Sequence, residues 1–450
     1  MNASKYNLFT NAEDGKIIAF NFITNSMLKM TLADYRIFQE ASSCDKLRKF
    51  EDPAAEELIS CLAKGGFLID DNIDEINLIK YRQEISKYGK SDSYALTVGL
   101  TTECNFKCVY CYENADRRGV ISGEVEEKII DYIRNLPEKS SLSVNWYGGE
   151  PLLVTGAIYR LSDKIMKIAD EKKMDYVAGI ITNGYLYNRD IALELSKRNC
   201  ATVQITLDGD EENHNKRRPL KTGGGTFKQI MENIKETCDI IPINLRINID
   251  KSNNDSFERL LNELDNYGVL NKLSSITPSM VQAFEYSSED TKQMIFSPEE
   301  YAPYYFKQLE IILDRGVDTM MYTSSPSRIH CGAIHKNSLM VDPCGNLYKC
   351  WDVFGVESEK VGTIGTGVKL NNTLLKWLLF DNLGQEKCRN CILLPLCLGS
   401  CPRLCVVEDK FVNERDHCPP QKYNVEKYVQ LIYKQSQMLN KRSYMRQEQC

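Results

Sequence analysis

The central half of the chain alternates short apolar runs with longer stretches in which apolar residues recur at helical spacing. Between residue 94 and about residue 315 there are six such steps, and helical segments such as GEVEEKIIDYIRNL separate them. The last expected helix covers roughly 298–314. This alternation favours parallel strands covered by helices, so we predict an α/β fold with an open or closed β/α barrel. The six expected strands are YALTVGLT, LSVNWYGG, YVAGIITNG, TVQITLDG, INLRINID and SSITPSMVQAF.

The pattern is different on both sides of this region. Residues 5–30 alternate apolar and polar positions around the turn NAEDGK, which predicts a hairpin. Two stretches with helical spacing follow, and the polar stretch at 86–93 is expected to be a linker. We therefore divide the chain into a small domain, the barrel, a cysteine-rich segment and a helical tail. Their predicted ranges are 1–90, 94–315, 325–420 and 421–450.

Four short motifs follow the first four expected strands, one at each strand end. The chemistry of such folds gathers at the carboxyl ends of the strands. Here the first strand is followed by a cysteine triplet, and the next three end in GGEP, TNG and LDG. We expect these motifs to form one site. Their residues are Cys104, Cys108, Cys111, Gly148, Gly149, Glu150, Pro151, Thr182, Asn183, Gly184, Leu207, Asp208 and Gly209.

Composition excludes some classes of function and raises a question about cysteine. The net charge of −6 over 450 residues gives no reason to expect a nucleic acid or an anionic membrane surface as partner. No apolar run approaches the length of a membrane span, and we see no export signal, so we expect a cytoplasmic protein. Seventeen cysteines in a reducing compartment indicate metal or iron–sulfur ligation. Four isolated ones are expected to be small buried side chains in helices: Cys44, Cys61, Cys200 and Cys238.

The triplet CNFKCVYC offers three thiolates where a closed metal site needs four ligands. A structural zinc site usually presents pairs of ligands and closes at four, so zinc is the first alternative. Spacings of three and two residues suit three corners of a 4Fe-4S cluster, whose fourth iron stays free for an outside ligand. The triplet with GGEP, TNG and LDG, in this order, resembles the radical S-adenosylmethionine (SAM) enzymes.

This resemblance implies a partial (β/α)6 barrel and a role for each motif. Cys104, Cys108 and Cys111 would hold a 4Fe-4S cluster whose open iron binds SAM. Tyr110 would lie against the adenine, and GGEP (148–151) would contact the methionine amino group. Asn183, Asp208 and Arg246 would contact the ribose or carboxylate of SAM. A low-potential cluster can break the sulfonium bond and release a deoxyadenosyl radical, which needs a closed, dry cavity.

A second set of cysteines resembles the SPASM domain, a seven-cysteine extension of radical SAM enzymes that modify peptides. The resemblance implies two auxiliary 4Fe-4S clusters, hence three in all. Cys344 could complete the inner one, or that cluster could be open and bind a substrate thiolate, whereas Cys405 is a spare. A zinc ribbon would explain CRNC alone and leave the later cysteines unused. The outer cluster would use Cys388, Cys391, Cys397 and Cys418, and the inner one Cys331, Cys350 and Cys401.

The N-terminal 90 residues resemble a winged-helix-like peptide-recognition domain, which docks a leader peptide as an added strand. The alternative is a purely structural cap. Sulfatase-maturing enzymes place an acidic residue directly after the cysteine that matches Cys350. Here Trp351 follows and Asp352 comes one place later, which argues against formylglycine formation.

We therefore predict a radical SAM peptide maturase that acts on a ribosomally made precursor and most readily forms a Cys-to-carbon thioether. Its partners would be the precursor peptide with its leader and an electron donor such as flavodoxin or ferredoxin. The alternatives are formylglycine formation, a carbon–carbon cross-link and epimerisation. An iron–sulfur scaffold that binds peptide without turnover would not need GGEP and the other strand-end motifs.

Overall fold

The structure is a computed structural model, and it describes residues 1–43, 52–89, 92–111, 119–283, 287–321, 331–381, 383–407 and 418–447. Its largest element is a ten-stranded sheet in the order β11-β10-β9-β8-β7-β6-β12-β13-β14-β15. Six consecutive parallel strands coincide with the six predicted runs. They are β6 (Ser93–Gly99), β7 (Ser141–Tyr147), β8 (Asp175–Thr182), β9 (Cys200–Leu207), β10 (Ile243–Ile249) and β11 (Ser275–Met280).

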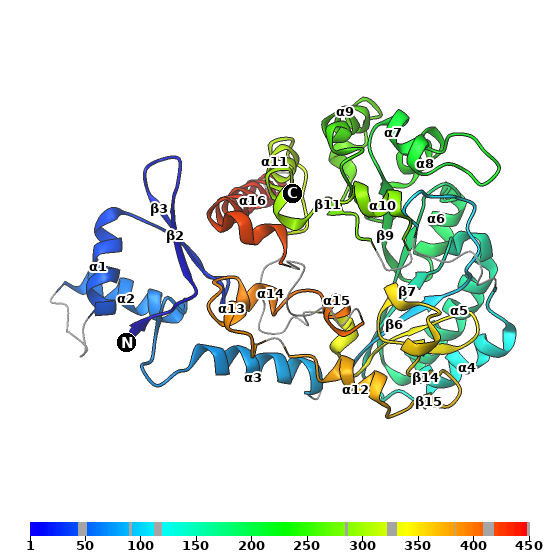
Figure 1. Cartoon of the computed structure of the whole chain (residues 1–450), viewed down its shortest axis with the longest axis horizontal. Coiled ribbons are helices and arrows are strands. Elements are labelled where there is room, and N and C mark those ends of the chain that lie inside the picture. Colours follow the sequence, from blue (N-terminus) through cyan, green and yellow to red (C-terminus); the bar gives the residue numbers. More distant parts are fainter. Residues whose placement is uncertain are drawn as a thin grey trace.

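Helices cover the outer face of these strands (Figure 1). Alternate strand residues such as Leu96, Val98 and Val144 point outward and are fully buried, as strand periodicity requires. The predicted helix at 298–314 is present as α11, and a capping box between Ser297 and Glu300 fixes its start. The helices are α4 (Gly123–Arg134), α5 (Thr155–Lys172), α6 (Arg189–Ser196), α7 (Glu211–Arg217), α8 (Phe227–Thr237), α9 (Phe257–Asn266), α10 (Glu289–Met294) and α11 (Pro298–Asp314), with short η1 (Pro151–Val154), η2 (Asn254–Ser256) and η3 (Leu270–Lys272).

The cysteine-rich segment continues the barrel sheet. Strand β12 (Ser338–Val341) pairs in parallel with β6, and three short antiparallel strands follow it. These are β13 (Asn346–Tyr348), β14 (Gly362–Thr363) and β15 (Gly367–Val368). The remaining elements are short: η4 (Gly332–Ile334), η5 (Trp351–Val353), η6 (Glu357–Glu359), α12 (Asn372–Leu378), α13 (Glu386–Arg389), α14 (Leu394–Cys397), α15 (Pro402–Val406) and η7 (Pro420–Asn424). The long α16 (Val425–Gln447) ends the chain and packs on α11.

The N-terminal region holds the predicted hairpin and a third strand. Strands β2 (Asn7–Asn11), β3 (Ile17–Asn21) and β4 (Met27–Met30) form an antiparallel sheet, and β1 (Asn2–Ala3) pairs with β5 (Leu68–Ile69). One face packs on α1 (Leu32–Ser43) and α2 (Pro53–Lys64) through residues such as Phe38 and Leu62. On the other face, Ile18 and Phe20 join the same hydrophobic cluster as Tyr428 of α16 and Leu393. The N-terminal sheet is therefore packed between its own helices and the C-terminal region.

The predicted linker at 86–93 is wrong for its first residues. Helix α3 (Glu75–Tyr88) continues to Tyr88 and contacts the cysteine-rich segment. Lys87 is 2% exposed and donates through Nζ to the carbonyl of Phe380, while the Tyr88 hydroxyl donates to the carbonyl of Leu378. The polar sequence was misleading because a buried lysine can satisfy a backbone carbonyl.

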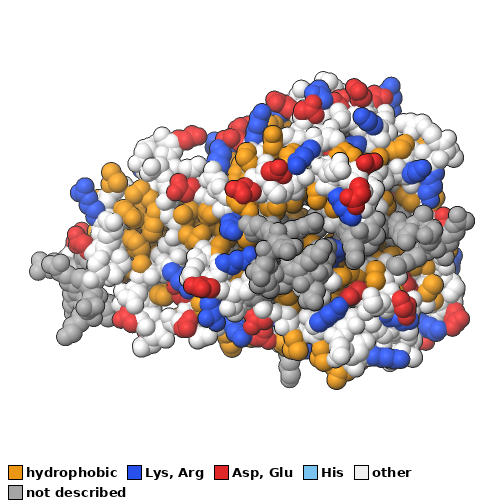
Figure 2. Space-filling view, in the orientation of Figure 1, with side chains coloured by type: hydrophobic (Ala, Val, Ile, Leu, Met, Phe, Trp, Pro, Cys, Tyr) orange, Lys and Arg blue, Asp and Glu red, His pale blue; other side chains and the backbone are white. Residues whose placement is uncertain are grey.

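One face of the molecule mixes lysine and arginine with aspartate and glutamate, and apolar side chains gather near the N-terminal sheet (Figure 2). Across the described ranges, no helix combines the length and the apolar character that crossing a bilayer requires.

Candidate active site and metal centres

The loop that carries the cysteine triplet leaves the carboxyl end of β6 and rests on the end of β7. The N–H groups of Gly149 and Glu150 donate to the carbonyls of Thr101 (2.9 Å) and Glu103 (2.8 Å). A Cβ at Gly148, where φ is +136°, would lie 2.3 Å from the oxygen of Thr101; one at Gly149 would lie 2.4 Å from that of Glu103. The two glycines are thus needed for the close approach of two backbones.

A second anchor of this loop was not expected from the sequence. Residues 105–109 run beside residues 217–221 like a short antiparallel ribbon, with a bridge between Phe106 and Leu220. Three backbone hydrogen bonds hold it: Lys107 N–H to Pro219 O (2.9 Å), Val109 N–H to Arg217 O (3.0 Å) and Lys221 N–H to Asn105 O (2.8 Å). The cysteine loop is therefore fixed from two sides.

Glu150 connects the ends of β7 and β8. Its carboxylate is fully buried and accepts from the Thr182 hydroxyl (2.7 Å), the N–H of Asn183 (2.8 Å) and the N–H of Leu152 (3.0 Å). Burial raises the pKa of Glu150, and these hydrogen bonds oppose the rise. Pro151 follows as the first residue of η1. GGEP and TNG, separate in sequence, thus form one rigid unit.

Asn183 lies next to the first cysteine. Its Nδ2 donates to Oδ1 of Asn105 (2.7 Å) and lies 3.9 Å from the sulfur of Cys104. The same sulfur accepts the N–H of Phe106 at 3.4 Å. Donors around a thiolate stabilise its charged form, which a metal ligand needs.

Tyr110 and Asp208 are brought together as the sequence predicted, and Arg246 is connected to them. The Tyr110 hydroxyl donates to Oδ1 of Asp208 (3.0 Å) and accepts from Arg218 (2.6 Å) and from Asn248 (3.0 Å). Asn248 in turn accepts from Nε of Arg246 (2.8 Å). The predicted cofactor contacts Tyr110, Asp208 and Arg246 therefore share one network.

Two arginines complete this network and were missed. Arg217 is 3% exposed and bonds both Asp208 (3.1 Å) and Asp250 (2.7 Å), whereas Arg218 is 8% exposed and lies 4.0 Å from Asp208. They belong to KRRPLK, a basic run that would ordinarily be read as a solvated loop. The sequence did offer one signal for these arginines: the basic run comes shortly after the LDG motif at the end of β9.

The environment of Cys108 in the triplet suits a thiol that gives up its proton to a metal. Burial raises the pKa of the Cys108 thiol to about 11, and the charge of Arg218 opposes this rise. Iron ligation would remove that proton, as metal binding does. Within the ranges described, no three His, Cys, Asp or Glu side chains lie together as the ligands of one metal ion do. A four-iron cluster places iron and sulfide between its thiolates, so its ligands stand farther apart.

The inner cysteines share one local geometry. Cys331, Cys350 and Cys401 each directly precede a helical turn: η4, η5 and α15. Each sulfur accepts the N–H two residues ahead, from Ala333, Asp352 and Arg403 respectively. Burial raises the pKa of all three thiols, and each is also raised by a neighbouring cysteine or carboxylate charge. Hydrogen bonds from N–H groups to the ligand sulfurs are one of the factors that set the reduction potential of an iron–sulfur cluster.

Cys344 does not lie with these three. It is exposed on the turn between β12 and β13, where its N–H donates to Oδ1 of Asp342 (2.9 Å). Its neighbour Pro343 approaches Gly119, at the other end of the hairpin from Cys350. This position favours the alternative in which Cys344 is no ligand of the inner cluster.

The outer cysteines line one pocket near the surface, together with Cys405. The sulfur of Cys397 accepts the N–H of Ser400 (3.1 Å), which the left-handed residues Leu398, Gly399 and Ser400 turn toward it. Lys422 donates to Cys418 at 3.2 Å. The structure thus brings together all four predicted outer ligands, and the spare Cys405 faces the same pocket. The four are Cys388, Cys391, Cys397 and Cys418.

The prediction that the four isolated cysteines are buried in helices is correct only in part. Cys61 is exposed on α2, so the prediction that it is buried is wrong. Cys200 and Cys238 are buried, but Cys200 begins strand β9 rather than lying in a helix. Cys44 lies outside the described residues.

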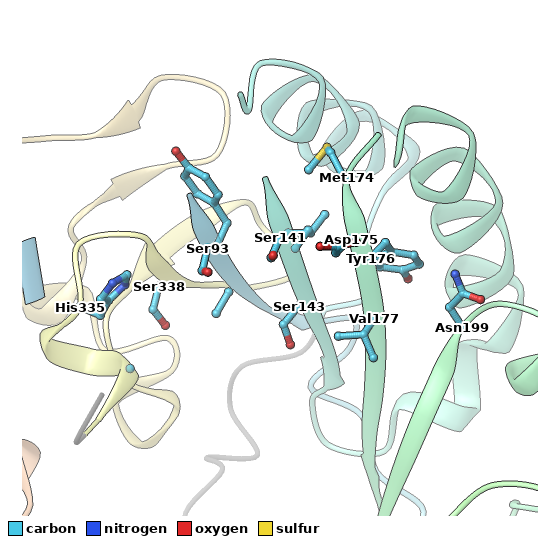
Figure 3. A pocket seen from close by; sticks show the side chains of 14 residues that line it. Ser93, Ser141, Ser143, Met174, Asp175, Tyr176, Val177, Asn199, His335 and Ser338 are labelled. Atoms are coloured by element: carbon cyan, nitrogen blue, oxygen red, sulfur yellow. The ribbon is translucent and has the colours of Figure 1, made fainter. Parts of the chain in front are cut away.

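A cavity of about 810 Å³ opens at the amino ends of the barrel strands, opposite the cysteine loop (Figure 3). Small inward residues make this room: Ala95, Ser143 and Val177 remain exposed, whereas closed β/α barrels fill their interior with large side chains. Hydroxyls of Ser93 and Ser338 also line it. The barrel is therefore hollow at the amino ends of its strands.

The chain is similar to several known proteins. The family model of the Radical SAM superfamily matches residues 98–264. The cysteine-type anaerobic sulfatase-maturating enzyme of Clostridium novyi (strain NT) is 24% identical over 330 residues, 67% of this chain and 86% of that protein. The sporulation killing factor maturation protein SkfB of Bacillus subtilis (strain 168) is 25% identical over 276 residues, 60% of this chain and 61% of that protein.

Among solved structures, native anSMEcpe with bound AdoMet and Kp18Cys peptide superimposes with a TM-score of 0.60. The likeness covers 77% of this chain and 98% of that one at 18% sequence identity. At this identity the likeness establishes the fold.

Proposed function

Because the chain carries a radical SAM domain over residues 98–264, we propose that it is a peptide maturase that forms a Cys-to-carbon thioether in a ribosomally made precursor. We assign residues 1–90 to peptide recognition, 94–315 to the barrel, 325–420 to a SPASM domain with two auxiliary 4Fe-4S clusters, and 421–450 to a tail. The third cluster belongs to the triplet, and flavodoxin or ferredoxin would supply electrons.

The observation that supports the chemistry is the junction of the cysteine loop with three strand ends. Backbone bonds from GGEP, the buried Glu150 and the ribbon at 217–221 all fix this loop. A peptide-binding scaffold without turnover would need none of them.

Each residue of the site has a definite task. Cys104, Cys108 and Cys111 bind iron as thiolates, and Glu150 keeps the strand ends in place. Tyr110 is oriented through its hydroxyl by Asp208, and the guanidinium of Arg217 lies over its ring at 5.1 Å from the centroid, so the adenine would lie against the opposite face. SAM, when bound, would supply the radical that takes a hydrogen atom from a substrate carbon. Joining that carbon to the cysteine sulfur would release the thiol proton and one electron, and the auxiliary clusters held by the cysteine-rich segment would accept that electron.

The N-terminal sheet supports peptide recognition through its edges. Both of its faces are covered, one by α1 and α2 and the other by α16 and the cysteine-rich segment. The order β2-β3-β4 leaves β2 and β4 as edge strands, where an extended leader can add by main-chain hydrogen bonds.

Co-expression with any short open reading frame that lies beside the gene tests this proposal. We expect the peptide to lose the mass of two hydrogen atoms per cross-link, and fragmentation to place the link between a cysteine sulfur and a carbon. Hydrogen exchange should show protection of β2 or β4 with the full precursor and none with a leaderless core. An unmodified peptide, with SAM consumed, would contradict the proposal.

Formylglycine formation is the second candidate, because the relative from Clostridium novyi is named as a sulfatase-maturating enzyme. A cysteine-containing sulfatase peptide separates the two. An aldehyde product would support formylglycine formation, and its absence would leave the thioether assignment in place.

A further inference from the structure

One carboxylate lies among the three inner cysteines. Asp352 is the second residue of η5, and its side chain is 17% exposed. Its negative charge acts on the thiols of Cys331, Cys350 and Cys401 alike. Its own N–H donates to the sulfur of Cys350. Three separate segments of the chain thus converge on this side chain.

Arg403 and Arg246 are positive groups that act on Asp352, and Arg403 forms a long ion pair with it. Nε of Arg403 lies 3.9 Å from Oδ2 of Asp352. A charge-assisted hydrogen bond between such groups is about 2.7–2.9 Å long. The Asp352–Arg403 pair is therefore longer than such a hydrogen bond.

Within the described residues, the two cysteines that the sequence left unassigned lie elsewhere. Cys344 is on the exposed turn at the far end of the β12–β13 hairpin. Cys405 donates through its sulfur to the carbonyl of Cys401 (3.1 Å) and faces the outer pocket. Asp352, by contrast, follows Cys350 by two residues and pairs with Arg403, which itself follows Cys401 by two residues.

We propose that the carboxylate of Asp352 is the fourth ligand of the inner auxiliary cluster. This inference rests on the cluster assignment within the proposed function. It makes the inner cluster a closed site with one oxygen and three sulfur ligands. A substrate thiolate then has no free iron to bind there. Because carboxylate is a harder ligand than thiolate, the potential should lie above that of an all-cysteine cluster.

Added thiol tests the closed site directly. Full-length protein in which Cys104, Cys108 and Cys111 are changed to Ala isolates the auxiliary clusters; these are reduced and examined by EPR with and without β-mercaptoethanol. We expect no response from the protein with Asp352, and a shifted signal from Asp352→Ala. Asp352→Cys should restore insensitivity to thiol and lower the midpoint potential. Cys344→Ala is the matched control and should behave like the parent protein.

Arg403→Gln separates ligation from ion pairing, because it removes the pair and keeps the carboxylate. If Asp352 is a ligand, Arg403→Gln retains the parent spectrum and Asp352→Asn does not. A thiol response from the parent protein, or equal loss of the cluster in Asp352→Cys and Asp352→Asn, would overturn the inference. Deoxyadenosine formation, measured with the triplet intact, reports on the proposed function independently of these outcomes.

Discussion

At the scale of single residues, Glu150 shows how buried polar groups shape the site. Its carboxylate accepts two backbone N–H groups and one hydroxyl from two strand ends. Sequence reasoning assigned Glu150 a cofactor contact. The structure adds a task that a short motif cannot reveal, because the partners of a side chain depend on which strands are neighbours.

Glu150→Gln should weaken this junction. The amide NH2 of glutamine would face N–H donors, so at least one hydrogen bond is lost, which costs about 1–3 kcal/mol when the group is buried. We expect SAM-dependent deoxyadenosine formation to fall by at least about tenfold. Glu359→Gln is the control, since Glu359 is also buried but bonds Lys376 and Trp377 in the cysteine-rich segment instead. Equal losses in both variants would contradict a local role.

Arg218→Gln should reduce iron retention by the triplet. Arg218 is the buried positive charge that most opposes the raised pKa of Cys108, so its loss makes the thiolate less favourable. We expect lower iron content at this site, measured by Mössbauer spectroscopy, with the auxiliary clusters unchanged. Arg198→Gln removes an arginine that pairs with Asp163 and Glu194 on the outside and should retain full iron. Unchanged iron in Arg218→Gln would exclude this role.

At the scale of elements, the sequence predicted the parallel strands and the motifs at their ends. These strands are buried apolar runs, and segments with helical spacing separate them. Both patterns can be recognised from residues that are close together in the sequence. The strands β12–β15 and the turns η4 and η5 were not predicted, because they are only two to four residues long. The ribbon at 217–221 was missed for a related reason: its pairing depends on contacts distant in sequence.

Gly149→Ala should separate the cysteine loop from β7. The new Cβ would lie 2.4 Å from a carbonyl oxygen of the backbone, so the loop must shift. We expect a loss of about 1–3 kcal/mol in unfolding free energy and of most SAM cleavage. Gly123→Ala is matched, because its Cβ meets nothing within 4 Å at the start of α4; it should be neutral or slightly stabilising. Full activity in Gly149→Ala would show that the contact is dispensable.

At the scale of the whole molecule, the N-terminal region is less separable than its sequence suggests. Ile18, Phe20 and Ile79 belong to the hydrophobic cluster that includes the barrel and α16. Deleting residues 1–90 would expose that surface. Composition and spacing cannot show such packing, because they indicate that a residue is apolar but not which distant residues it will contact.

Metal-free and cluster-loaded protein should differ in their stability at high pH. Burial raises the pKa of Cys108 and Cys331 to about 11 and that of Cys397 to about 12, from an ordinary value of 9.0. The neutral thiols thus contribute stability that is fully present below about pH 9 and is lost as the pH rises through about 11 to 12. Denaturant unfolding of metal-free protein should show this decline. Cluster-bound thiols are already deprotonated, so the loaded protein should lack these thiol contributions.

The central claim is that the triplet Cys104, Cys108 and Cys111 holds a cluster that cleaves SAM. The most direct measurement is deoxyadenosine released from anaerobically reconstituted protein with dithionite and SAM. The account predicts steady release from the intact chain and none from the variant with all three cysteines changed to Ala, which keeps its auxiliary iron. No deoxyadenosine from fully iron-loaded protein, or equal release from the triple variant, would contradict it.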